Sequence, residues 1–438
     1  MVLFYILVAI SPMPNHPLFE AHFAGLTVVK WLGILCCGYA LFRLSLRPSV
    51  PAFLKSWQSR SFLILLLLAT VSYLTLSKPD NLTFTPIVTY FTYLPLFFTT
   101  ICVVDTYKRL HNTLLAAVCG ELLTSLYVLR EFQASGGTEL RPGYIAGDSN
   151  YFATCLLLVL PITVYFVKLK GPLWRRWFCA SSLLIMLAAF TLASSRGGLV
   201  GLCVVILYMV VYSGQSRRGA IAMALLVLPM LLFSPASPLQ RMLHPDYGDY
   251  LGAQVRREFW AEGLNMVYTH PVTGIGLGNF TAQSTAQVEK GKKGMACNTF
   301  LGIAAELGIP GLIAYCIIVS GALLSAGKLR RKGKRTHDLF LQYAGQSMQA
   351  GLLGFAAAAV FVSAEYQKPF WIMTALTATV PTLLRDSEYK RSAAQRPRAV
   401  VYLKASLNQG CIGESRWAAV TGSTEPYDGL NRGSDVAL

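Results

Sequence analysis

Residues 61–77 read SFLILLLLATVSYLTLS, and none of these side chains carries a charge. A helix rises about 1.5 Å per residue, so roughly 20 apolar residues cross the 30 Å hydrocarbon core of a bilayer. The stretch comes close to that length, and Arg60 borders it on one side. It therefore predicts a membrane-spanning helix.

Similar apolar runs recur along the chain. Of its 438 residues, 54% are hydrophobic and only 13% are charged, about half the charged share of a soluble domain. This excludes an ordinary soluble protein and a disordered one. The runs are unbroken rather than alternating, which excludes an outer-membrane barrel. The fold class is therefore predicted as all-α and polytopic, with about twelve transmembrane helices near residues 1–14, 22–42, 61–77, 86–104, 113–130, 149–167, 177–194, 199–213, 219–235, 298–326, 346–364 and 369–384.

The basic residues predict the orientation. Lys and Arg exceed Asp and Glu by 38 to 21, which in a soluble protein would favour a nucleic acid partner. Here the excess lies mainly in short connections between spans, as the positive-inside rule requires, so membrane lipids and not nucleic acid are expected as partners. Both termini are then cytoplasmic. Residues 1–385 form the membrane domain, 236–297 a large loop inserted on the opposite face, and 386–438 a disordered cytoplasmic tail.

Two arginine groups fall on that opposite face. Arg196 lies in the turn Ser194–Gly198 between two spans, where it either reaches lipid headgroups or grips an anion with its guanidinium fork. Arg256 and Arg257 lie on a predicted amphipathic helix on the non-cytoplasmic face. Basic residues are disfavoured there by the positive-inside rule, so we expect them to pair with an anionic group. That partner is either a nearby carboxylate such as Glu258 or an anionic substrate.

The stretch 270–280 reads HPVTGIGLGNF. Its glycines superficially resemble a dinucleotide fingerprint, but G-x-G-x-G-N has the wrong spacing, and neither a strand nor a βαβ unit accompanies it. No nucleotide cofactor is expected. We predict a glycine-rich loop that packs closely against a span or a substrate.

The next span begins after Cys297. Asn298 is a candidate N-cap of its helix, and Gly308 with Pro310 is expected to break that helix partway. Glu306 lies within the span, either as a structural contact or as part of a site.

Arg141, Asp148 and Asn150 precede a further span on the same face, where either Asp148 or Asn150 could simply cap the helix. No cluster of carboxylates or histidines typical of a metal site accompanies these groups, and no cofactor is expected. Because arginines dominate, the expected ligand is anionic, a phosphate or pyrophosphate on a lipid.

The order of these motifs resembles the bacterial O-antigen ligase and O-antigen polymerase superfamily. The matching residues are SSRGGL from Ser194, R-x-x-x-W from Arg256 to Trp260, HPVTGIGLGNF from His270, and CNTFLGIAAELGIPGL from Cys297. Their specific part covers about residues 140–325, and the flanking spans match only in number and orientation.

The resemblance implies a polytopic, glycosyltransferase C-like enzyme of the bacterial inner membrane that needs no metal. Such enzymes take a glycan from undecaprenyl pyrophosphate on the periplasmic side and pass it to a hydroxyl of a glycan, of lipid A–core or of a protein. By resemblance, Arg196 and Arg256 hold the pyrophosphate, with Arg257 as the alternate. Arg141, Asp148, Asn150, His270 and Asn298 are the further expected substrate-binding residues.

Cys297 departs from the family pattern. Family ligases have a histidine directly before the asparagine, which is thought to activate the acceptor hydroxyl. Cys297 replaces it as base only if Arg196 or Arg256 lowers the pKa of its thiol. Otherwise His270, Asp148 or Glu258 is the base, the donor needs none, or the protein binds the donor without transferring it. A polymerase, a protein ligase, and a transporter of lipid-linked glycans are the alternative functions.

Overall fold

The computed structural model describes residues 1–20, 22–23, 26–46, 55–77, 81–136, 142–169, 171–212, 217–233, 238–244, 247–285, 287–289 and 292–385. The predicted tail at 386–438 and the predicted site residue Arg141 lie outside these ranges.

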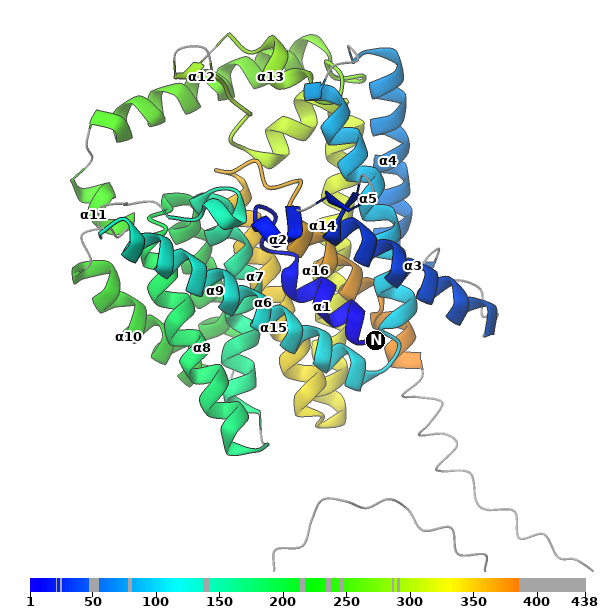
Figure 1. Cartoon of the computed structure of the whole chain (residues 1–438), viewed down its shortest axis with the longest axis vertical. Coiled ribbons are helices and arrows are strands. Elements are labelled where there is room, and N and C mark those ends of the chain that lie inside the picture. The colour runs from blue at the N-terminus through cyan, green and yellow to red at the C-terminus, as the bar shows by residue number, and fades with distance from the viewer. Residues whose placement is uncertain are drawn as a thin grey trace, which may run out of the picture. The chain divides into compact units, whose positions relative to one another are not determined.

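The described chain is almost entirely helical (Figure 1). Its strands are two short antiparallel hairpins, β1 (His22–Phe23) with β2 (Leu26–Thr27) and β3 (Gln287–Glu289) with β4 (Lys292–Lys293). Helices prevail because a bilayer offers no water to backbone groups, which a helix satisfies internally. In chain order the helices are α1 (Val2–Ile10), α2 (Pro17–Glu20), α3 (Val28–Leu46), α4 (Trp57–Thr75), α5 (Asn81–Val103), α6 (Tyr107–Ala134), α7 (Ser149–Lys168), α8 (Leu173–Leu192), α9 (Arg196–Tyr212), α10 (Arg217–Phe233), α11 (Pro238–Leu243), α12 (Tyr247–Thr269), α13 (Asn279–Gln283), α14 (Thr299–Thr336), α15 (Leu339–Ala359) and α16 (Lys368–Ala378).

A helix lies in each of the twelve predicted ranges, and the protein is a multi-pass membrane protein. Within the described ranges, seven helices are long and apolar enough to cross a membrane: α3, α4, α5, α6, α7, α8 and α14. Twelve crossings are therefore not confirmed. At 1.5 Å per residue, α1 with its 9 residues spans only about 14 Å and does not cross a bilayer alone, whereas α16 has 11 residues and is followed, after a turn at Thr379, by further helical residues at 380–385.

Helix α7 lies at the centre of the core. Nearly all of its residues are buried, and it packs against α8, α9 and α15, while α14 packs against α15 and α4. The short α16 is also buried, and its Trp371 contacts Phe62 of α4 and Tyr93 of α5. These packed helices form the scaffold for the polar groups at their ends.

Helix α14 is broken at Gly308, as the sequence predicts. Gly308 has φ 71° and ψ −177°, and the loop before α13 supplies partners to the interrupted backbone. The N–H groups of Ile275 and Gly276 donate to the carbonyls of Ala305 and Glu306 at 2.9 and 3.2 Å, and Ile309 donates to the Pro271 carbonyl at 2.7 Å. The glycine-rich loop thus packs against a span, as expected.

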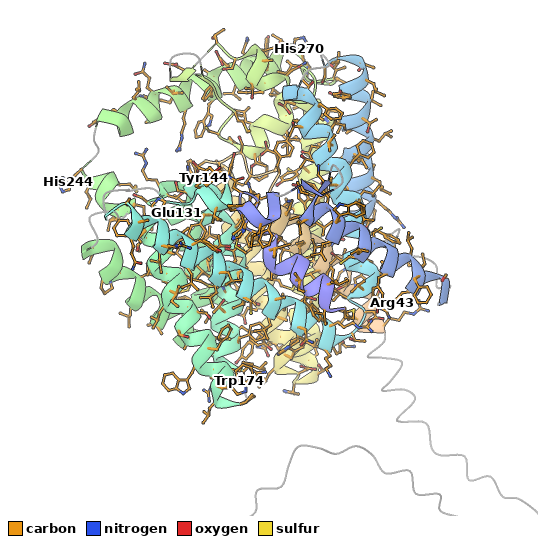
Figure 2. The ribbon with its side chains drawn as sticks, viewed as in Figure 1. Arg43, Glu131, Tyr144, Trp174, His244 and His270 are labelled. Carbon is orange, nitrogen blue, oxygen red and sulfur yellow. The ribbon has the colours of Figure 1, made fainter. Side chains whose placement is uncertain are left out.

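The predicted loop 236–297 carries α11, α12, α13 and the β3–β4 hairpin. The expected helix at 256–267 lies within α12. Figure 1 shows α12 and α13 together at one end of the helices. Trp174, beside the basic residues Arg175 and Arg176, is labelled at the other end in Figure 2. Which end faces the periplasm stays a prediction.

Candidate functional site

Cys297 lies directly before the start of α14. The side chain of Asn298 caps the helix by accepting hydrogen bonds from the N–H groups of Phe300 and Leu301 at 3.0 and 3.1 Å. Cys297 has a left-handed backbone, with φ 49°, and is half-buried. The predicted cap is confirmed, and it commits the Asn298 side-chain oxygen to the helix.

Helix α12 brings Arg256 to Cys297, within hydrogen-bonding reach of its sulfur. Burial raises the pKa of the Cys297 thiol, and the nearby guanidinium only partly opposes this. The carboxylates of Asp148 and Glu365 raise it further. The thiol is therefore protonated at neutral pH, which disfavours the reading in which Arg256 turns it into a base.

The starts of α7 and α9 are joined by a chain of side-chain hydrogen bonds. Asp148 caps α7 by accepting from the backbone N–H and the side-chain amide of Asn150 at 2.7 and 2.8 Å. The amide oxygen of Asn150 accepts from the Ser195 hydroxyl at 2.9 Å. Ser195 in turn accepts from the Gly198 N–H at 3.1 Å. Arg196, the first residue of α9, is therefore anchored beside the start of α7.

The connection between α15 and α16 lies against these groups. A Cβ on Gly197 would approach the Phe361 side chain to 2.9 Å, and the Phe361 ring is 6.2 Å from the ring of Trp260 on α12. The Thr299 N–H donates to the Val362 carbonyl at 3.1 Å. Segments that carry Arg196, Arg256 and Cys297 thus meet around one short connection.

A cavity of about 460 Å³ opens next to Cys297. Helices α5, α7 and α14 and the α15–α16 connection contribute to its wall, and residues 278–281 and 295–296 complete it. Its polar lining combines hydroxyl, amide and carboxyl groups. The lining residues with such side chains are Thr85, Thr89, Tyr151, Thr281, Glu306, Ser363, Glu365, Tyr366 and Gln367.

Glu365 is the most enclosed carboxylate of this cavity. It is only 7% exposed, and its Oε2 atom has no hydrogen-bond partner among the described residues. Burial raises the pKa of its carboxyl to about 8, and Glu306 adds to the effect, while hydrogen bonds from the backbone and from Thr299 oppose it. Its backbone is fixed, since the Trp371 indole donates to the Glu365 carbonyl at 2.8 Å.

The carboxylate of Glu306, unlike the Oε2 atom of Glu365, accepts hydrogen bonds from backbone N–H groups. Its Oε1 atom accepts from the Phe280 N–H at 3.3 Å, and the Gly278 N–H also contacts the carboxyl. Glu306 therefore helps to hold the glycine-rich loop, as well as lining the cavity.

None of the predicted catalytic or substrate-binding residues in the described chain lines the cavity itself, and some lie well apart from it. His270 is exposed at the end of α12, where its Nδ1 atom pairs with the Thr269 hydroxyl at 2.9 Å, and Figure 2 shows it at the far upper end of the helices. Arg257 is exposed beside the half-buried Arg256. Glu258 is also exposed and accepts from the side-chain amide of Gln254 at 3.1 Å.

The sequence analysis missed Tyr151 and the whole connection from Ser363 to Gln367. A signal for the connection exists. Ser363, Glu365, Gln367 and Lys368 interrupt two apolar runs within a few residues. The predicted topology puts this interruption on the same face as the arginines. Tyr151 carries no such signal, because an aromatic residue in an apolar helix is ordinary core.

The O-antigen ligase family model matches residues 181–316. The match includes Arg196, Arg256, Cys297 and Asn298, and it confirms the resemblance for this segment. No curated protein sequence matches the chain. Helix α7 and the α15–α16 connection both lie outside the matched residues.

Proposed function

We propose that the chain, which matches the O-antigen ligase family over residues 181–316, is a glycosyltransferase for lipid-linked glycans. Membership supports glycan transfer in a membrane. The donor we propose is a glycan on undecaprenyl pyrophosphate, and the acceptor is a hydroxyl on the periplasmic side of a bacterial inner membrane.

The observation that supports this proposal best is the placement of Arg256 beside Cys297, next to the anchored start of α9. Arginine binds phosphate oxygens with two parallel hydrogen bonds, and the first turn of a helix adds partial positive charge. Arg196 at the start of α9 and Arg256 on α12 would stabilise the negative charge that develops on the departing pyrophosphate.

In the proposed reaction, the acceptor oxygen bonds to the anomeric carbon while the bond from that carbon to the pyrophosphate oxygen breaks. The electron pair leaves with undecaprenyl pyrophosphate, and the acceptor proton leaves the oxygen. Cys297 would line the acceptor side as a neutral thiol. Asp148, Asn150 and Asn298 would act by fixing the helix starts, because their side chains are engaged there.

The proposed orientation rests on the ends of α14. Its last turns carry a run of basic residues from Lys328 to Arg335, whereas its start lies beside Cys297. A basic end is typical of the cytoplasmic side. With that end in the cytoplasm, Arg256 and the cavity would face the periplasm, and both termini would be cytoplasmic.

A polymerase or a protein ligase would use the same donor chemistry with another acceptor. A transporter of the lipid-linked glycan is a second candidate, and one observation favours it. Glu121, near the middle of α6, is only 1% exposed, and neither carboxyl oxygen has a partner among the described residues. Buried carboxylates in mid-membrane are typical of transport pathways.

The test is release of undecaprenyl pyrophosphate from a lipid-linked oligosaccharide by the purified protein in lipid nanodiscs, with a crude envelope extract as acceptor. Arg256→Ala and Arg196→Ala should abolish release. Arg196→Lys should impair it, because the lysine ammonium cannot make the two parallel hydrogen bonds of a guanidinium. Arg331→Ala, which removes an exposed arginine near the far end of α14, is the control. Full release by Arg196→Ala and Arg256→Ala would refute the assignment. Donor movement across the bilayer without release would favour transport.

A further inference from the structure

Two side chains that line the cavity beside Cys297, Ser363 and Glu365, have a buried oxygen without a hydrogen-bond partner in the described chain, and Glu365 is the carboxylate of the two. Glu365 lies outside the segment that matches the family. Its side chain is enclosed, its Oε2 atom has no partner in the described chain, and it lines the cavity wall. A buried carboxylate oxygen without a partner costs free energy, so such a group points to a ligand that pairs with it.

We infer that Glu365 accepts the proton of the attacking hydroxyl, and that the cavity beside it binds the sugar that carries this hydroxyl. This inference rests on the proposed function, since it identifies the base and the acceptor class of that reaction. It gives Glu365 the task that the histidine before the asparagine has in the ligases this chain resembles.

The other candidate bases are engaged or misplaced. The Oδ1 atom of Asp148 accepts two hydrogen bonds from Asn150. His270 and Glu258 are exposed and absent from the cavity wall. Burial raises the pKa of the Cys297 thiol from an ordinary value that is already well above neutral, whereas the Glu365 carboxyl, with a pKa of about 8, is roughly one-tenth ionised at pH 7 and increasingly ionised above it. Of these groups, Glu365 alone lines the cavity and has a buried oxygen without a hydrogen-bond partner in the described chain.

Glu365 also interacts with Cys297 and lies on a connection that is held in place by hydrogen bonds. Its charge acts on Cys297, the residue that stands where the family pattern has its histidine. The connection that carries it is fixed at several points. The Ala364 N–H donates to the Thr299 hydroxyl at 2.8 Å, and the Tyr93 hydroxyl donates to the Tyr366 carbonyl at 2.5 Å. A base must be held rigidly within reach of the proton it removes.

The cavity suits a carbohydrate. Its volume of about 460 Å³ falls within the range of small-molecule sites. Sugars present many hydroxyls and apolar C–H faces, and the wall offers both kinds of partner. Thr85, Thr89 and Gln367 supply hydroxyl and amide groups, while Tyr151 and Phe280 supply aromatic surface. We therefore assign the acceptor class as a saccharide hydroxyl.

The step balances without a further reactant. The Glu365 carboxylate takes the acceptor proton as the acceptor oxygen bonds to the anomeric carbon. The bond to the pyrophosphate breaks, and undecaprenyl pyrophosphate carries away the electron pair. Glu365 is left as the neutral acid and returns its proton to water before the next turnover.

The test uses the full chain in nanodiscs, with an undecaprenyl-pyrophosphate-linked oligosaccharide as donor and an envelope extract as acceptor. We expect Glu365→Gln to lower the rate of glycan transfer by about 10²-fold or more, the usual effect of losing a general base. Donor binding should stay near the wild-type level. The matched control is Asp338→Asn, which removes a carboxylate that caps α15 and replaces it with an equally good capping residue.

A wild-type rate in Glu365→Gln would overturn the inference and leave the proposed function intact. Absence of transfer by the wild-type protein would overturn both. If Glu365→Gln does not fold, Glu365→Asp decides, because it keeps the carboxylate but moves it back by one methylene. It should retain folding and show a lower rate with a shifted pH profile. A wild-type rate and profile in Glu365→Asp would overturn the inference.

Discussion

The hydroxyl of Ser195 donates a 2.9 Å hydrogen bond to the side-chain oxygen of Asn150. The two residues are 45 positions apart in sequence, and each lies at the start of a helix. Because Ser195 also accepts from the Gly198 N–H, one hydroxyl ties the first turn of α9 to α7. The position of Arg196 next to Ser195 depends on this link.

Ser195→Ala removes both hydrogen bonds of that hydroxyl. We expect the free energy of unfolding to fall by about 0.5–1.5 kcal/mol per lost bond. Transfer should fall by roughly tenfold or more, because a small displacement of a binding group is costly for catalysis. Rates of undecaprenyl pyrophosphate release and thermal unfolding in detergent measure the two effects.

Ser181→Ala is the matched control, since within the described chain the exposed Ser181 hydroxyl bonds only to carbonyls of its own helix α8. Equal rates in both variants would show that the Asn150–Ser195 link does not position Arg196.

Gly308→Ala should destabilise the protein. A Cβ at Gly308 would lie 2.4 Å from the Val272 carbonyl oxygen, and the backbone φ of 71° is strained for any residue with a side chain. The strain alone costs about 1–3 kcal/mol. Denaturant unfolding of the purified protein measures the loss. Gly33→Ala in α3 is the control, because no heavy atom lies within 4 Å of its added Cβ. A loss in Gly33→Ala as large as in Gly308→Ala would contradict this account.

The sequence was sufficient for the features that depend on local chemistry. Hydropathy predicted a helix in every one of twelve ranges, and the Gly308–Pro310 pair predicted the break in α14. The Asn298 cap also followed from residue type. These features depend on neighbours within a few positions, which a single sequence displays.

Features that depend on distant contacts were not predictable. Nothing in the sequence links Asn150 to Ser195, or sets Glu365 beside Cys297. The polar residues at 363–368 indicate an interruption between two apolar runs, but the sequence does not show which of them lines a cavity. The number of crossings stays a prediction, because hydropathy alone does not show where a helix ends.

Cys297→His should restore transfer to Glu365→Gln. An unperturbed imidazole is mostly neutral at pH 7 and accepts a proton, whereas the buried thiol does not. The left-handed backbone at position 297 tolerates histidine better than most residues. We expect the double variant to transfer glycan at least about tenfold faster than Glu365→Gln, measured as labelled glycan transferred to acceptor.

Cys297→Ala in the Glu365→Gln background is the control for that rescue, because it changes the same position without adding a base. Recovery by alanine as well as by histidine would mean that removal of the thiol, and not a new proton acceptor, restores the rate.

The stability of the protein should fall as pH rises from about 4.5 to about 8. The Glu365 carboxyl has a pKa of about 8 in the folded protein, against an ordinary value of 4.5. Between these values the folded state binds more protons than the unfolded state, so the free energy of unfolding decreases with rising pH. The dependence should be flat below the ordinary value and level off above the folded one.

Glu365→Gln should remove part of that slope in thermal unfolding measured across this pH range, since the buried carboxyls of Glu121 and Glu306 remain. The same slope in wild type and Glu365→Gln would mean that another group causes it. Several titratable groups of the described chain interact electrostatically with Glu365. They are Glu306 and Tyr315 on α14, Tyr90 and Tyr93 on α5, Tyr151 on α7, Cys297, and Tyr366 of its own connection. Glu306→Gln separates the contribution of its nearest carboxylate, because it should lower the pKa of Glu365 and shift the end of the slope to lower pH.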